Sequence, residues 1–308
     1  MPTRSRTVFP LNPRYRVTGL PLGGARSLRR GPGSDVAGAR PYTPGDPIST
    51  IDWRASARLS TARGRDDFVV RERYAEEAPR VVVFVDARPS MQLFAPPFPW
   101  LSKPAAVRSA AELIAESATA RNAPVGYLDL RDGDPYWLEP GGRDVLDRVA
   151  ERCAEPGAFD APADGIAEGL EFLARFRGQL SAGTFVFVLS DFLGEPVPDA
   201  VWLTAAARRW EVVPVVVQDE TWEQSFPLVD SVVVPLVEPG ADSSVEVRVS
   251  RRDARARREA NEGRRDAIVA SFHSLGLDPI VVATSDDDEV DRLFTDWSSR
   301  RIAVRRGR

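Results

Sequence analysis

The chain has 308 residues, of which 43% are hydrophobic, and a formal net charge of −4 at pH 7. This length and apolar content suffice for one large buried core, and no run of about 18 apolar residues predicts a membrane-spanning helix. Cys153 is the only cysteine, which excludes a disulfide within the chain. Because the first thirty residues also lack the apolar segment of a secretory signal, a cytoplasmic protein is expected.

Residues 1–78 are predicted to form an irregular N-terminal arm that packs on the domain following it. The first forty residues are rich in glycine, proline and arginine, which favours an extended or loop-like chain. The segment from Tyr42 to Pro47 contains Pro-Gly and predicts a turn. Asp52 is expected to cap a short helix that starts at Trp53, and residues 68–74 predict a strand that leads toward the core.

Residues 79–308 alternate apolar runs with helical segments. The predicted strands are Val81–Val85, Val125–Leu130, Phe185–Leu189, Val212–Val217 and Ile280–Ala283. The predicted helices are Ala105–Arg121, Arg143–Ala154, Gly165–Arg177, Ala200–Arg209, Arg252–Leu275 and Asp288–Ser299. This alternation predicts an α/β fold with a doubly wound, mostly parallel sheet and helices on both faces. A β-hairpin excursion is expected near residues 230–250.

Acidic and hydroxyl side chains follow the predicted strands. Asp86 ends the first apolar run and Ser90 lies in the next turn, while Asp191 ends a later run. Asp164 stands at the start of a predicted helix, where it would serve equally well as an N-cap. Since open α/β sheets bind ligands at the carboxyl ends of their strands, these oxygens predict a site for Mg²⁺ or Mn²⁺.

The spacing Asp86-x-Arg88-x-Ser90 resembles the Asp-x-Ser-x-Ser loop of the metal-ion-dependent adhesion site in von Willebrand factor A-like domains. In this resemblance Asp191 matches the late aspartate of those domains, and Asp164 occupies the place of their threonine.

A second resemblance covers nearly the whole chain, from about residue 19 onward. Its residues are Arg40-x-Tyr42-x-Pro44-Gly45-Asp46, then Ile51-Asp52-Trp53-Arg54-Ala55-Ser56-Ala57-Arg58, then Arg71-Glu72-Arg73-Tyr74-Ala75-Glu76-Glu77. These segments resemble the family catalogued as domain of unknown function 58. The resemblance implies a von Willebrand A-like domain and a partner role beside MoxR-type AAA+ ATPases. Many members of that family carry N-terminal membrane helices, which this sequence lacks.

Arg88 leaves two interpretations of the strand-end site open. At about 6 Å and an effective dielectric constant of about 20, a guanidinium repels a dication by about 5 kcal/mol. The long side chain can swing out to solvent and leave a metal site in place. Alternatively, the guanidinium replaces the ion and pairs two of the carboxylates, which would make the site degenerate and independent of metal.

A protein–protein adaptor that is not an enzyme is therefore expected. A carboxylate of the partner would meet the Asp86–Ser90 loop, either on a metal or directly on Arg88.

The segment around Trp53 has two interpretations. Trp53 packs against the sheet while Asp46 and Asp52 satisfy turn and helix amides, or the arginines of this segment form a docking face. Those arginines are Arg40, Arg54 and Arg58.

Two other functions remain as alternatives. The aspartates could serve a metal-dependent phosphoester hydrolase, although no general base beyond them is apparent and no triad can be built around His273. The arginine-rich ends could bind a membrane surface or nucleic acid, since residues 1–40 contain eight arginines against one acid, Asp35. The negative net charge gives nucleic acid no support.

Overall fold

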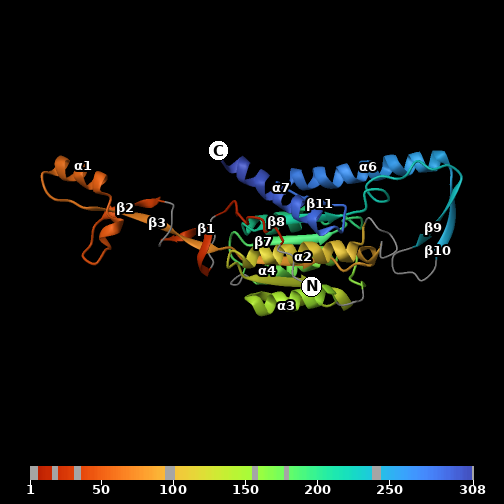
Figure 1. Ribbon diagram of the computed structural model, residues 1–308, viewed down its shortest axis with the longest axis horizontal. Coiled ribbons are helices and arrows are strands. Elements are labelled where there is room, and N and C mark those ends of the chain that lie inside the picture. Colours follow the sequence, from red (N-terminus) through yellow and green to blue (C-terminus); the bar gives the residue numbers. More distant parts are fainter. Residues whose placement is uncertain are drawn as a thin grey trace.

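The computed structural model describes residues 6–15, 20–30, 36–93, 101–154, 159–176, 180–237 and 244–306. An α/β body carries an extended arm at one end and a β-hairpin at the other (Figure 1). The strands of the body are β4 (Val81–Val85), β5 (Val125–Asp129), β6 (Tyr136–Gly141), β7 (Phe185–Ser190), β8 (Glu211–Val217) and β11 (Ile280–Val282). Its helices are α2 (Lys103–Thr119), α3 (Arg143–Ala154), α4 (Gly165–Arg175), α5 (Asp199–Ala207), α6 (Arg251–Ser274) and α7 (Asp287–Arg306). Short 3₁₀ turns are η1 (Ile48–Thr50), η2 (Pro89–Gln92) and η3 (Arg131–Gly133).

The six strands of the body form one sheet in the order β11-β8-β7-β4-β5-β6. All neighbouring pairs are parallel except β5 and β6. Strands β4, β7 and β8 are buried along their whole length, because their continuous apolar runs need cover on both faces. The five predicted strands are confirmed, and β6 is an additional antiparallel edge strand that the sequence analysis missed.

Helices cover both faces of this sheet, which confirms the predicted doubly wound architecture and is consistent with a von Willebrand A-like fold. Helices α2, α3 and α7 contribute to the core cluster on one face. Helices α4 and α5 and the C-terminal end of α6 contribute to the cluster on the other face. Five of the six helices lie within two residues of their predicted ranges, whereas α7 continues past the predicted end at Ser299 to Arg306.

The first described residues pack into the core of the body. Phe9 and Leu11 are buried, and the ring centroid of Phe9 lies 5.2 Å from that of Phe294 and 6.1 Å from that of Trp297. The predicted division at residue 78 does not anticipate this contact. Residues 6–15 therefore belong structurally with the body rather than with the arm.

The arm is built on a three-stranded antiparallel sheet with β3 (Val69–Ala78) between β1 (Leu20–Arg30) and β2 (Val36–Pro41). As expected of an irregular arm, the register shifts within both pairings. The arm does not pack along the body as predicted, because its strands pair with one another and extend away from one end (Figure 1). Helix α1 (Trp53–Arg63) lies between β2 and β3 in the chain, at the outer end of the arm (Figure 1). The predicted cap is confirmed, since the Asp52 side chain accepts hydrogen bonds from the amides of Arg54 and Ala55.

The predicted hairpin is confirmed as β9 (Val232–Val237) paired antiparallel with β10 (Ser244–Val249). The Pro239-Gly240 turn that the sequence places between the two strands lies outside the described residues. Helix α6 follows β10 directly and is exposed along most of its length, as its mixed charges predict. Nowhere in the described ranges is a helix both long and apolar enough to cross a membrane.

Gly169 allows α4 to pack closely on β4, and this contact can be tested. A Cβ atom at position 169 would lie 2.2 Å from the Phe84 ring, whereas one at Gly263 in α6 would meet nothing within 4 Å. We expect Gly169→Ala to lower the free energy of unfolding by about 1–3 kcal/mol, because a packed core resists added volume. The matched control Gly263→Ala should instead raise the free energy of unfolding by about 0.5–1 kcal/mol, because glycine destabilises a helix interior relative to alanine. Urea unfolding of both variants checks this, and equal effects would contradict the close packing.

Candidate functional site

Two cationic side chains and several carboxylates converge at the carboxyl end of the central strands. Asp86 follows β4, Asp191 follows β7 and Glu223 lies in the turn after β8. Lys103 is the first residue of α2. This is the edge of the sheet where the sequence predicts a site, and the cluster brings together residues from four separate parts of the chain.

Arg88 does not swing out to solvent. Its side chain turns back onto Asp86, with Nε 2.9 Å and Nη2 2.7 Å from the Asp86 Oδ2 atom. The Nη2 atom also donates to the Ser190 hydroxyl at 3.1 Å and lies 3.5 Å from Asp191 Oδ1. Arg88 is only 6% exposed. The guanidinium therefore pairs with one predicted ligand and lies beside a second, as one of the two interpretations expects.

A glycine makes room for this arrangement. A Cβ atom at Gly194, in the loop after β7, would lie 2.0 Å from Arg88 Nη1. The backbone of that loop is fixed in turn by the Ser190 hydroxyl, which accepts the Phe192 amide and donates to Asp86 Oδ2. The position of Arg88 thus depends on the loop after β7 as well as on its own turn.

Lys103 supplies the second positive charge and is fully buried. Its Nζ atom lies 2.9 Å from Asp191 Oδ2, 2.6 Å from Glu223 Oε1 and 3.1 Å from the Ser90 carbonyl oxygen. A cation in the first turn of a helix opposes the helix dipole, so it needs strong compensation from nearby anions. Asp191 and Glu223 provide that compensation, and the ammonium bridges the ends of β7 and β8.

The two carboxylates that flank Lys103 differ in pKa. Burial alone would raise the pKa of Asp191, but the charge of Lys103 and hydrogen bonds from the Leu193 amide, Lys103 and Ser90 hold it below its ordinary value. Burial raises the pKa of Glu223 above its ordinary value, and the attraction of Lys103 only partly offsets that effect. Burial also opposes the charged form of Arg88, yet Asp86 and Asp191 raise the pKa of Arg88.

These residues do not fit a divalent metal ion. Both cations lie within 3.5 Å of the carboxylate oxygens that would hold it. At about 4 Å and an effective dielectric constant of about 20, each would repel a dication by about 8 kcal/mol. Within the described ranges, no group of three or more acidic, histidine or cysteine side chains could hold a metal ion.

Three of the four predicted ligands converge, namely Asp86, Ser90 and Asp191. Asp164 is different, since it is exposed and, within the described ranges, no hydrogen bond or ion pair joins it to the others. It occupies the N-cap position of α4, but its side chain accepts no capping hydrogen bond. Asp164 therefore occupies the N-cap position that the alternative interpretation predicted, but its side chain does not cap the helix.

The sequence analysis missed Lys103, Ser190 and Glu223. Lys103 carried a signal, because it is the single lysine in a chain whose other cationic side chains are, apart from one histidine, arginines. An ammonium is a compact point charge that fits between several oxygens, whereas a guanidinium is a broad planar fork. Such a lone lysine in an arginine-rich chain indicates a position where arginine does not fit.

The charged side chains of the arm pair with one another rather than with a strand-end site. Arg40 lies 2.6 Å from Asp46 Oδ1 and 3.3 Å from Glu72 Oε1, and Asp52 lies 2.7 Å from Arg71. The hydrogen bond from Arg40, supported by the Thr43 amide, lowers the pKa of Asp46 to about 2. Arg40 is therefore engaged inside the arm and is not a free docking arginine.

The expectation that Trp53 packs against the sheet is wrong. The residue is 58% exposed, and its ring contacts Phe68 edge-on at a centroid distance of 6.0 Å. It lies at the start of α1, at the outer end of the arm and away from the sheet of the body (Figure 1). Arg54 and Arg58 are also exposed.

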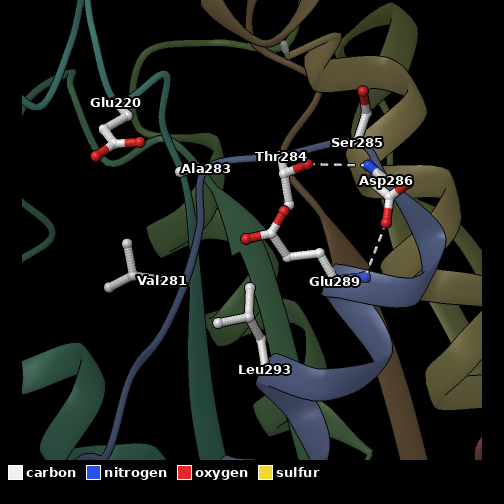
Figure 2. A pocket seen from close by; sticks show the side chains of 8 residues that line it. All are labelled: Glu220, Val281, Ala283, Thr284, Ser285, Asp286, Glu289 and Leu293. Carbon is white, nitrogen blue, oxygen red and sulfur yellow. Dashed lines mark hydrogen bonds between the residues drawn. The ribbon is translucent and has the colours of Figure 1, made fainter.

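A hollow of about 530 Å³ opens beside β11 and the start of α7, and it is acidic. Figure 2 shows Glu220, Asp286 and Glu289 around it, with the Asp286 side chain accepting the Glu289 amide at 3.0 Å. The other lining residues are Val281, Ala283, Thr284, Ser285 and Leu293. With three carboxylates and no basic side chain in its wall, this hollow does not suit a phosphate or another anion.

Removing the Lys103 charge should be costly. We expect Lys103→Met to lower the free energy of unfolding by about 3–5 kcal/mol at neutral pH, because it leaves two buried carboxylates without their cation. Asp191 and Glu223 then bind protons more readily in the folded state, so the difference from wild type should shrink as the pH falls toward about 4. Urea unfolding at several pH values checks this. The exposed Arg255→Met is the matched control, and a pH-independent loss would point to packing alone.

The same charges predict how the protein responds to metal. Calorimetric titration of the wild type with Mn²⁺ should give no saturable binding, because Arg88 and Lys103 already neutralise the carboxylates. The double variant Arg88→Ser/Lys103→Ala restores the serine of the resembling loop and removes both cations, so it should gain Mn²⁺ affinity. Saturable binding by the wild type that disappears in Asp86→Ala would contradict this assignment.

Comparisons with known proteins give the family of the chain. Two solved structures are similar, both aligned over 72% of this chain and 99% of the other. They are an aerotolerance-related membrane protein from Bacteroides fragilis NCTC 9343 with multiple mutations to serines, at 10% identity and a TM-score of 0.42, and the conserved hypothetical protein BatB from Bacteroides thetaiotaomicron, at 12% and 0.39. No curated protein matches the sequence. The model of the family described as "Protein of unknown function DUF58" matches residues 38–267, well over half of the chain, and the protein therefore belongs to this family.

Proposed function

We propose that the protein is a non-catalytic adaptor that docks onto another protein through the tip of its arm, and that its partner is a MoxR-type AAA+ ATPase. The observation that carries the docking proposal is the exposed apolar and basic surface at the tip. The identity of the partner rests on the resemblance of the chain to its family.

The tip presents large apolar side chains to solvent. Ile48, Trp53 and Phe68 are 69%, 58% and 42% exposed, and all three belong to the segment around α1. Single exposed apolar residues are ordinary, but several large ones on one small projection mark an interaction surface. Tryptophan is also the residue that most often dominates the binding energy of protein interfaces.

The charge of the tip favours an acidic partner. Helix α1 contains three arginines and no acidic residue. Arg63 pairs with Asp67, whereas Arg54 and Arg58 make no ion pair with a described residue. Two exposed guanidinium groups one helical turn apart, next to an aromatic anchor, complement an acidic segment that also carries an apolar side chain.

The strand-end site gives less support for docking. A partner carboxylate would have to compete with Asp86 for an arginine that is 6% exposed. The same ion pairs weigh against a metal-dependent hydrolase, since Asp86 and Asp191 are occupied by Arg88 and Lys103 and the acidic hollow would repel a phosphoester. We infer that this cluster holds strand ends and a helix together, while recognition takes place elsewhere.

Ion pairs also weigh against an arginine-driven binder of lipid or nucleic acid. Arg6 lies 2.9 Å from Asp291, and Arg301 lies 2.6 Å from the buried Glu211. Arg14 also pairs with Glu211, at 3.4 Å. These arginines of the basic ends are thus committed within the body, which lowers the positive potential available to an anionic polymer.

Binding measurements with a purified MoxR-type AAA+ ATPase test the proposal. We expect Trp53→Ala to weaken binding by tenfold or more, and Arg54→Glu/Arg58→Glu to weaken it further. The loss of affinity caused by the charge reversal should be larger at low ionic strength, because salt screens exposed charges. The matched controls are Leu203→Ala on α5, which is 53% exposed, and Arg252→Glu/Arg255→Glu on α6. Equal affinity of tip and control variants would refute docking by the tip, and no binding by the wild type would refute the partner.

A further inference from the structure

The hairpin at the end opposite the arm has an unpaired edge. Strands β9 and β10 form a two-stranded sheet that pairs with no other described strand. Its base rests on a small cluster of Phe226, Val249 and Ala254, beside the start of α6. A two-stranded ribbon is marginal by itself, and such an open edge offers a row of backbone donors and acceptors to another strand.

One face of the hairpin is apolar and only partly covered. On β10, Val245 and Val247 are 65% and 38% exposed, and on β9 Val232 is 41% exposed. Val249, which shares this face, is buried against the cluster at the base. The apolar stripe therefore begins inside the protein and continues into solvent, so that a further strand laid beside it would extend an existing core.

The opposite face of β10 carries one acid and one base. Glu246 and Arg248 are exposed, and the side chain of neither makes a hydrogen bond or an ion pair within the described part of the chain. They are two residues apart and so point to the same side of the strand. This leaves two charges of opposite sign, each without a partner, on an edge strand.

We propose that the open edge of β10 pairs with β10 of a second copy of this chain, antiparallel and centred on Val247. Such a pair places Glu246 of each copy opposite Arg248 of the other and aligns the apolar faces. The result is a four-stranded sheet with two-fold symmetry, in the order β9-β10-β10-β9. A two-fold interface requires this self-complementarity, in which each residue meets its counterpart reciprocally.

The charges select this register over its neighbours. Centring the pair on Glu246 sets two carboxylates against each other, and centring it on Arg248 does the same with two guanidinium groups. Like charges directly opposite destabilise a sheet, whereas opposite charges stabilise it. A shift by a single residue would turn every valine to the charged face. The sequence Val245-Glu246-Val247-Arg248-Val249 is thus matched to itself in one alignment.

The edge of β9 is less suited to the same role. Pro235 has no amide hydrogen, so a strand added to β9 would lack a complete ladder of hydrogen bonds. Strand β9, Val232–Val237, also contains no charged residue that would fix a register. The pairing is therefore assigned to β10.

Charge reversal tests the proposal on the full-length chain. Sedimentation equilibrium over a range of concentrations should find a dimer for the wild type. Glu246→Arg alone and Arg248→Glu alone each put like charges opposite each other, so each should weaken dimerisation by tenfold or more. Combining both changes in one chain should restore it, and an equimolar mixture of the two single variants should form a one-to-one heterodimer.

The matched control is Glu259→Arg on the exposed part of α6, which should leave the dimer intact, and circular dichroism verifies that each variant is folded. A wild type that stays monomeric at the highest concentration reached would overturn the proposal. So would a dimer that neither single reversal weakens, because the interface would then lie elsewhere. A dimer lost in both single variants but not restored by their combination or mixture would likewise overturn the assigned register.

Discussion

The buried ammonium of Lys103 is the interaction on which the arrangement of the strand ends depends. It lies between Asp191 after β7 and Glu223 after β8, and it does so from the first turn of α2, where the helix dipole disfavours a cation. Such a charge is tolerated only with its partners in place, so the three elements are fixed together. Arg88 extends the same network to β4 through Asp86, and Gly194 leaves the space that its guanidinium needs.

This network changes what the strand ends can do. In an open α/β sheet that edge normally receives a ligand, and the loop Asp86–Ser90 has the form of an ion-binding turn. Here two side chains of the protein supply the positive charge, and the carboxylates are hydrogen-bonded to them at 2.6–3.1 Å. A cation provided by the chain cannot be removed by a chelator or exchanged with a partner. The cluster therefore has a structural role, because it holds the strand ends and α2 together. For this reason we assign recognition to surfaces away from it.

The body could be predicted from sequence because its strands are continuous apolar runs that alternate with helical segments. In the arm, the start of α1 could be predicted because Asp52 is a clear N-cap. Strand β6 could not be predicted from the sequence, because it is an edge strand that contains Pro140 and Gly141 and is only partly buried. The cluster escaped for another reason. Lys103 meets partners 88 and 120 residues away, and no local pattern specifies contacts over such separations. Trp53 was expected to be covered because tryptophan usually is, but α1 lies at the outer end of the arm, away from the body, and leaves the residue exposed.

The two ends of the molecule expose apolar and charged side chains that could contact other proteins, whereas the strand ends of the body bury theirs. The body is closed on both faces by helices and has the arm at one end and the hairpin at the other (Figure 1). The arm exposes Trp53 beside Arg54 and Arg58, which make no ion pair with a described residue. The hairpin exposes an apolar stripe beside Glu246 and Arg248, whose side chains likewise have no ion pair within the described ranges. The chemistry of the ends differs. Arginines of one sign on α1 suit a different, acidic molecule, while the alternation of Glu246 and Arg248 suits a copy of itself. Two such surfaces at opposite ends allow one copy to hold a partner at the arm while pairing with a second copy at the hairpin. A dimer of this kind would present two arm tips, and a partner with repeated subunits would then be held by both at once, which raises its effective affinity without any new contact.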